Sequence, residues 1–220
     1  DTCVELFVNY TDTPLAIIGN ELYERSIVTF RMSKPMDVQM GKGNGCIAIC
    51  FQPGMAYQFF NIPMGLLTNT TTPLTDLWNT EALIIEEKLA EIKSNDTRSA
   101  IIQKHLIDIL KGSHTDVQIL HCTKKVKLAS SQLTVNQLCQ DIGISQRHLS
   151  RKFQQHIGLS PKEYLRVSRF VDSLYQLKKY PTTSLTKIAY QSGYYDQAHF
   201  IRDYKTYTGH TPSEVVQSPH

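Results

Sequence analysis

The stretch Ser145-Gln-Arg-His-Leu-Ser-Arg-Lys-Phe153 returns fifty-one residues later as Asp196-Gln-Ala-His-Phe-Ile-Arg-Asp-Tyr204. The same offset relates two further pairs, Gly158 to Gly209 and Ser160-Pro161 to Thr211-Pro212. Self-similarity at a fixed spacing is the sign of a duplicated structural unit. The C-terminal part of the chain is therefore expected to hold two copies of one unit.

Each copy has the residue order of a helix-turn-helix motif. In the first, Thr134 is predicted to cap a helix, Gly143 to supply the tight turn, and Ser145 to cap the next helix. The corresponding residues of the second copy are Ser184, Gly193 and Asp196. Two short helices joined by such a turn form the motif that many DNA-binding proteins use.

A second helix-start signal follows each motif. Ser160-Pro-Lys-Glu163 and Thr211-Pro-Ser-Glu214 each combine a capping residue, proline at the first helical position and glutamate three residues after the cap. The helix from Pro161 carries apolar residues along one side: Tyr164, Val167, Phe170, Val171, Leu174 and Leu177. This helix is predicted to join the two motifs rigidly.

The second helix of each motif has one apolar face and one polar face. Leu149 and Phe153 are expected in the core, as are Phe200 and Tyr204. The residues predicted to face DNA bases are Gln146, Arg147, Ser150 and Arg151, then Gln197, Ala198, Ile201 and Arg202. Arginine suits guanine, glutamine suits adenine, and an exposed isoleucine suits the thymine methyl group. The residues predicted to reach phosphates are His148, Lys152, His199 and Lys205.

The charge distribution favours this interpretation over solvated faces on a helical bundle. Residues 1–122 carry a net charge of −5, and residues 123–220 carry +8. A basic half joined to an acidic half indicates a nucleic-acid partner for the basic one. The repetition of core, cap and outward arginine in both copies is the stronger argument.

The longest matching stretch is Ile188-Ala-Tyr-Gln-Ser-Gly-Tyr-Tyr-Asp-Gln-Ala-His-Phe-Ile-Arg-Asp-Tyr-Lys-Thr-Tyr-Thr-Gly-His-Thr-Pro-Ser-Glu214. Because of this stretch, residues 133–217 resemble the DNA-binding domain of the AraC/XylS family of bacterial transcription regulators. Tyr204 stands where phenylalanine is usual in that family. The resemblance implies seven helices and two recognition helices in successive major-groove segments, about 34 Å apart. It assigns base contact to Arg147, Ser150, Arg151, Gln197, Ala198, Ile201 and Arg202.

The N-terminal part is predicted to be β-rich. Short strand-like runs at Val4–Val8, Ile27–Phe30 and Ile47–Phe51 alternate with turn signals, a pattern typical of a barrel or sandwich. Helical periodicity follows over 80–111, with a break at 94–97. The expected class is α+β with two domains: a sensor or assembly domain at 1–111, a junction at 112–132, and the all-α DNA-binding domain at 133–217.

The N-terminal part also resembles an uncharacterised sensor-type domain that precedes AraC-type domains. The matching residues are Asp1–Asn9, Phe51–Gly54 and Leu74–Trp78. The resemblance implies a cupin-like β-rich part, and it implies that further chain precedes Asp1.

The sequence contains few features of a catalytic or metal site. All eight histidines lie at or after His105, so no histidine-based metal site is expected in the β-rich part. No phosphate loop, nucleophile elbow or zinc spacing occurs. Cys46 and Cys50 are interpreted as apolar strand residues rather than a redox or metal pair. No enzyme activity, catalytic residue, cofactor or metal is predicted.

An effector pocket is not assigned by the sequence. Aromatic residues of the first part are candidates for its lining or for the core: Tyr23, Phe30, Phe51, Tyr57, Phe59, Phe60 and Trp78. Apolar residues of 80–111 are candidates for a subunit interface or for the intrachain core: Leu83, Leu89, Ile102, Leu106 and Ile109.

These features predict a cytoplasmic bacterial transcription regulator that binds double-stranded DNA. Candidate partners are RNA polymerase, a small-molecule effector and a second copy of the chain, with no membrane partner, because no signal peptide or long apolar run occurs. Two alternatives remain. One is an alkyl-transfer repair protein that uses Cys46 or Cys50 as the acceptor, and the other is a regulator without an effector.

Overall fold

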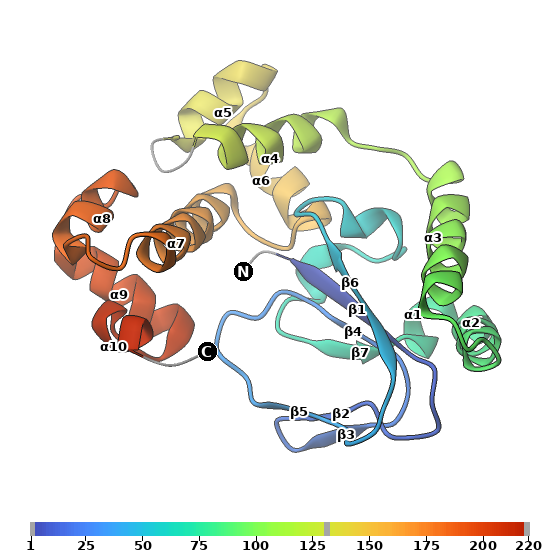
Figure 1. The fold of residues 1–220 in the computed structure, drawn as a ribbon. Helices are drawn as coiled ribbons and strands as arrows, with labels where there is room; N and C mark the ends of the chain where they lie inside the picture. The colour runs from blue at the N-terminus through green and yellow to red at the C-terminus, as the bar shows by residue number, and fades with distance from the viewer. Residues whose placement is uncertain (1–2, 130–132, 218–220) are drawn as a thin grey trace.

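The computed structural model describes residues 3–129 and 133–217, and it has a β-rich part followed by a helical part (Figure 1). One antiparallel sheet has the strand order β6-β1-β4-β7, and a second has the order β3-β2-β5. The strands are β1 Val4–Asn9, β2 Ala16–Ile18, β3 Glu21–Tyr23, β4 Ile27–Thr29, β5 Val38–Met40, β6 Cys46–Phe51 and β7 Thr71–Pro73. The α+β class predicted from the sequence is confirmed.

Strand β1 shows why this segment folds as a strand at the centre of the first sheet. Leu6 and Val8 are fully buried, whereas the alternating Glu5 and Phe7 are half-buried. Successive side chains of a strand point to opposite faces, so one face of β1 joins the core. Opposite β1, Cys50 pairs with Glu5 on the outer face and is exposed. Cys46 and Cys50 both lie in β6, as the sequence predicts, and Cys46 is the less exposed of the two.

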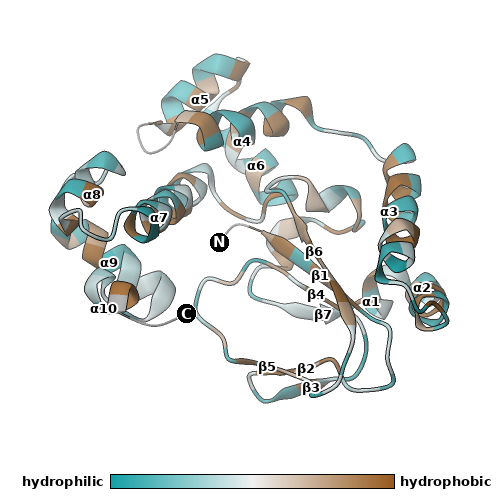
Figure 2. Cartoon of the chain, viewed as in Figure 1, coloured by the Kyte–Doolittle hydropathy of each residue, from teal (hydrophilic) through white to brown (hydrophobic). Residues whose placement is uncertain are grey.

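Helices cover the inner face of the first sheet. They are η1 Ala56–Gln58, η2 Met64–Leu66, α1 Thr75–Trp78, α2 Thr80–Ala90 and α3 Asn95–Lys111. Ser94 caps α3 by accepting a hydrogen bond from the Thr97 N–H, which explains the break between α2 and α3. Figure 2 shows hydrophilic and hydrophobic residues on both helices. Their buried residues Leu89 and Ile102 belong to the core around β1, as intrachain contacts.

Most of the aromatic residues considered for an effector pocket pack into this core. Phe60 lies edge-on to Phe30 and to Phe51, with ring centroids 5.7 and 5.8 Å apart. The Trp78 indole N–H donates to the Phe59 carbonyl at 2.9 Å. Aromatic side chains in such contacts stabilise the fold, so these rings form part of its core.

The helical part holds two core clusters, one for each motif. Its helices are α4 Val117–Ala129, α5 Val135–Ile142, α6 Gln146–His156, α7 Pro161–Lys179, α8 Leu185–Gln191, α9 Gln197–Thr208 and α10 Pro212–Gln217. Helix α7 packs against both motifs (Figure 1). At 1.5 Å per residue its 19 residues span about 28 Å.

Helix α4 lies inside the segment predicted as a junction. Its buried residues Ile119, Cys122 and Val126 pack in the same cluster as Leu138 of α5 and Leu149 of α6. The segment 117–129 therefore forms a helix that packs with the helical part. With α4 included, the described residues of this part form the seven helices that the family resemblance implies. The domain limits themselves stay predictions.

Gly158 offers a test of the contact between the two parts, with Gly209 as its repeat equivalent. Both have positive φ, 83° and 77°. A Cβ on Gly158 would lie 2.9 Å from the Met64 carbonyl oxygen, whereas one on Gly209 would meet no atom within 4 Å. Alanine should cost about 1–2 kcal/mol of backbone strain at either site. At Gly158 crowding should add about 1–3 kcal/mol.

Urea unfolding of Gly158→Ala and Gly209→Ala measures this difference. Equal losses of unfolding free energy would show that crowding against Met64 adds no cost to the Gly158→Ala substitution.

Candidate nucleic-acid interface

The caps that start the motif helices are formed by the residues that the sequence indicates. Thr134 and Ser160 each form a capping box, with Gln137 and Glu163 as the third residues of their helices. Ser145 accepts from the His148 N–H, and Asp196 accepts from the His199 N–H. The hydrogen bonds from Ser160 lower the pKa of Glu163 below its usual value. These caps fix where α5, α6, α7 and α9 begin.

Six of the eight residues predicted to face bases are exposed: Gln146, Arg147, Arg151, Gln197, Ala198 and Arg202. They lie on α6 and α9, whose opposite faces bury Leu149, Phe153, Phe200 and Tyr204 completely. Each helix therefore presents an exposed arginine at the same repeat position, Arg151 and Arg202. Their contact with bases stays a prediction.

The remaining two residues, Ser150 and Ile201, are half-buried. Ile201, predicted to be exposed, is only partly so, because its side chain packs against the core of the second motif. On the apolar side of α7, Val171 is 39% exposed. It lines a cavity between α7 and the β-rich part.

The four residues predicted to reach phosphates have different surroundings. Lys205 is exposed, and His148 is half-buried. His199 is half-buried and lies edge-on to the Tyr194 ring, with centroids 5.9 Å apart. Lys152 forms an ion pair with Asp116, and only 18% of its side chain is exposed. Lys205 is thus the most accessible of the four, whereas Lys152 already has an anionic partner.

A buried ion pair connects α7 to the second recognition helix. Asp203 is fully buried, and its carboxylate accepts from Arg166 Nε at 2.8 Å and from the Tyr194 hydroxyl at 3.2 Å. The hydrogen bond from Arg166 to Asp203 raises the pKa of Arg166. Arg169 donates to the Gly193 carbonyl at 3.1 Å. These contacts fix the turn and the recognition helix of the second motif on α7.

Asp116 is a residue that the sequence analysis does not identify as part of this interface. Asp116 Oδ1 accepts from the Gln118 and Ile119 N–H groups and so caps α4. An aspartate just before Val117 is a helix-start signal that the sequence contains. Its ion pair with Lys152 has no such signal, because 36 residues separate the two.

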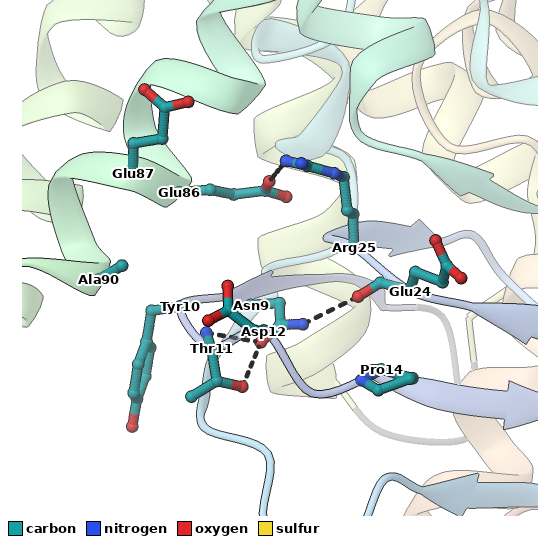
Figure 3. A pocket seen from close by; sticks show the side chains of 10 residues that line it. All are labelled: Asn9, Tyr10, Thr11, Asp12, Pro14, Glu24, Arg25, Glu86, Glu87 and Ala90. Atoms are coloured by element: carbon teal, nitrogen blue, oxygen red, sulfur yellow. Dashed lines mark hydrogen bonds and ion pairs between the residues drawn. The ribbon is translucent and has the colours of Figure 1, made fainter.

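Among the cavities of the described residues, two involve the β-rich part away from α6 and α9. One, of about 500 Å³, lies where the β-rich part meets α4 and α7, and its lining includes Phe51, Met55, Leu120, Tyr164 and Val171. The other, of about 450 Å³, is lined by polar residues of the β-rich part and α2. Figure 3 shows Glu86 in this second cavity extending toward Arg25, with which it forms a 2.8 Å ion pair. Because Glu86 also accepts from the Ser26 N–H, its carboxylate is already paired.

The five cysteines all lie in the described residues, and they form no disulfide there. Burial raises the pKa of Cys46, which lowers the fraction of thiolate that an alkyl acceptor would need. Cys50 contacts Cys3, whose pKa is raised to about 12 by burial and by a hydrogen bond with Cys50. Over residues 3–129 and 133–217, no helix has both the length and the hydropathy to cross a membrane.

Comparison with known proteins finds similarity in the helical part of the chain. Residues 138–218 match the model of a helix-turn-helix domain. The Msm operon regulatory protein of Streptococcus mutans is 26% identical over 164 residues, 73% of this chain and 56% of that protein. An uncharacterized HTH-type transcriptional regulator of Haemophilus influenzae is 34% identical over 84 residues, 38% of this chain and 28% of that protein. The chain thus spans about half or less of the length of these relatives.

Among solved structures, ToxT from Vibrio cholerae is 14% identical, with a TM-score of 0.47, and covers 97% of this chain and 88% of its own. The C-terminal domain of the response regulator AraT from Geobacillus stearothermophilus is 21% identical, with a TM-score of 0.45, over 49% of this chain and 89% of its own. The match to the model of a helix-turn-helix domain covers residues 138–218, a little over a third of the chain.

Proposed function

We propose that this protein is a sequence-specific DNA-binding transcription regulator located in the cytoplasm. The observation that carries the proposal is the repeated recognition helix, with Arg151 and Arg202 exposed at equivalent positions of α6 and α9. Arginine side chains on such helices contact guanine in the major groove. Helix α7, about 28 Å long, supports a spacing that lets both helices reach one face of the duplex.

The test is selection from a library of genomic DNA fragments by the full chain. We expect enrichment of a site with two recognised segments about one helical turn apart. Recovery of fragments without any shared sequence would contradict the proposal, because binding through phosphates alone does not select bases.

We also propose that a small effector binds the cavity of about 500 Å³ between the β-rich part and the helices. Its volume lies in the range of small-molecule sites, about 300–1,000 Å³. Its walls come from both parts, since Phe51 lies in β6, Leu120 in α4 and Tyr164 in α7. A molecule held there would contact the sensor part and the DNA-binding part together.

Binding of the selected DNA in the presence and absence of a cellular metabolite extract tests the effector. We expect the affinity to change with the extract, and we expect Val171→Trp, which fills the cavity, to remove that change. Equal affinity under both conditions would favour a regulator without an effector. Contacts with RNA polymerase and with a second copy of the chain stay predictions.

A further inference from the structure

The two halves of the first recognition helix, α6, have different surroundings. The N-terminal half carries the exposed Gln146, Arg147 and Arg151. The C-terminal half packs on η1 and η2 of the β-rich part. There the buried His156 lies edge-on to Tyr57, with ring centroids 4.3 Å apart. The β-rich part thus holds the end of α6 that does not carry the predicted base contacts.

Asp116 connects this end of α6 to the β-rich part. Its carboxylate accepts a hydrogen bond from Lys152 Nζ, and His156 Nε2 lies 3.8 Å from the same oxygen. The Asp116 N–H donates to the Tyr57 hydroxyl at 2.6 Å, and that hydroxyl donates to the His114 carbonyl at 3.0 Å. We call Tyr57, Asp116, Lys152 and His156 the interlock.

The ion pair of the interlock is largely shielded from water. Only 18% of the Lys152 side chain and 14% of the Asp116 side chain are exposed. Burial alone would raise the pKa of Asp116, but the hydrogen bonds from Lys152 and the Ile119 N–H lower it overall. If Lys152 turned toward a phosphate, Asp116 would keep a poorly compensated charge. The structure therefore disfavours the phosphate contact predicted for Lys152.

The sequence repeat supports a structural role for this position. Fifty-one residues after Lys152, the second recognition helix has Asp203. Asp203 also forms an ion pair with the segment that precedes its motif, through Arg166 of α7. The charge at this position is therefore positive in the first copy and negative in the second. An aspartate is repelled by phosphate, so the second copy does not use this position for a phosphate contact. In both copies this position joins the recognition helix to the preceding helical segment.

We propose that Lys152 is a positioning residue for DNA binding. Through Asp116 and Tyr57, it holds the first recognition helix in a fixed orientation on the β-rich part. A change in the β-rich part then alters the affinity for the DNA segment that α6 reads. The inference rests on the proposed function and adds a route by which the first part of the chain controls it.

Three substitutions in the full chain test the interlock against a phosphate contact. Lys152→Met keeps the apolar stem, Asp116→Asn keeps the shape, and Tyr57→Phe keeps the ring against His156. We expect each to weaken binding to the selected site by a factor within the range typical of coupled sites, about 5- to 150-fold. The dependence of affinity on salt should stay as in the unsubstituted protein, because no phosphate contact is lost. In a nuclease footprinting experiment, the DNA should lose protection only over the segment that α6 contacts.

Lys205→Met is the matched control, since Lys205 is an exposed lysine of the second recognition helix. Loss of a phosphate contact there should reduce the slope of log affinity against log salt by about 1. The proposal is overturned if Lys152→Met reduces this slope in the same way. It is also overturned if Asp116→Asn strengthens binding, as expected when removal of an acidic group frees Lys152 for DNA.

Hydrogen exchange separates failure of the interlock from failure of the proposed function. If the unsubstituted chain selects no DNA site, the proposed function fails. The interlock still predicts faster amide exchange in the C-terminal half of α6 for Asp116→Asn and for Tyr57→Phe, with α9 unchanged. Unchanged exchange in α6 would overturn the interlock whatever the DNA result.

Discussion

Replacing Arg151 and Arg202 together by alanine is expected to weaken binding to the selected DNA site by about 2–6 kcal/mol. Each arginine should contribute about 1–3 kcal/mol if it pairs with a guanine. The two losses should add, because the residues lie on different helices and would contact separate DNA segments. Each single substitution should also relax base preference at one position of the site. Titration of the selected site and of single-base variants measures both effects.

Gln155→Ala and Thr206→Ala provide the control. Both residues are exposed, they occupy equivalent positions of α6 and α9, and neither belongs to the predicted base-facing set. They should leave the affinity nearly unchanged. If the double arginine variant lost affinity equally for all sequences, the arginines would contact phosphates and the assignment of base contact would be wrong.

Asp203→Ala is expected to destabilise the second motif by about 3 kcal/mol. Removing one partner of a buried ion pair leaves the other without compensation, which typically costs about 3–5 kcal/mol. We expect the lower end of that range, because 37% of the Arg166 side chain is exposed and water compensates part of its charge. The substitution also leaves the Tyr194 hydroxyl without the acceptor it has in Asp203. Thermal or urea unfolding of the full chain measures the loss.

Asp203→Asn and Arg166→Met complete the test. The asparagine keeps one acceptor oxygen, which can serve either Arg166 or Tyr194, and should cost less than alanine. In a double-mutant cycle, Asp203→Ala combined with Arg166→Met should cost less than the sum of the single substitutions, because each single change already breaks the pair. Additive losses would show that the two side chains do not stabilise each other.

The start of each motif helix could be predicted from the sequence because capping is local. Thr134, Ser145, Ser160, Ser184 and Asp196 each accept a hydrogen bond from an N–H three residues later. A cap and the N–H that it binds lie within one helical turn, so residue type and spacing carry the information. The same holds for the apolar period that buries Leu149, Phe153, Phe200 and Tyr204.

The sheet order and the place of α4 could not be predicted in this way. Strand β1 pairs with β6, although about forty residues separate them. Short apolar strands carry no local signal for their partners, so pairing depends on which faces are buried together. For the same reason the sequence predicts a junction where α4 lies, although the apolar residues of α4 pack in the core of the first motif.

The sequence by itself determined the duplicated motif and the exposed arginine of each copy, because both follow from spacing within a few helical turns. Only the tertiary structure decided that Lys152 pairs with Asp116 and that Ile201 is half-buried. Each of these depends on a partner or a core that the chain brings close by folding. A residue on the outward face of a helix is exposed only if no other element packs against that face. At the C-terminal end of α6, the β-rich part packs against it.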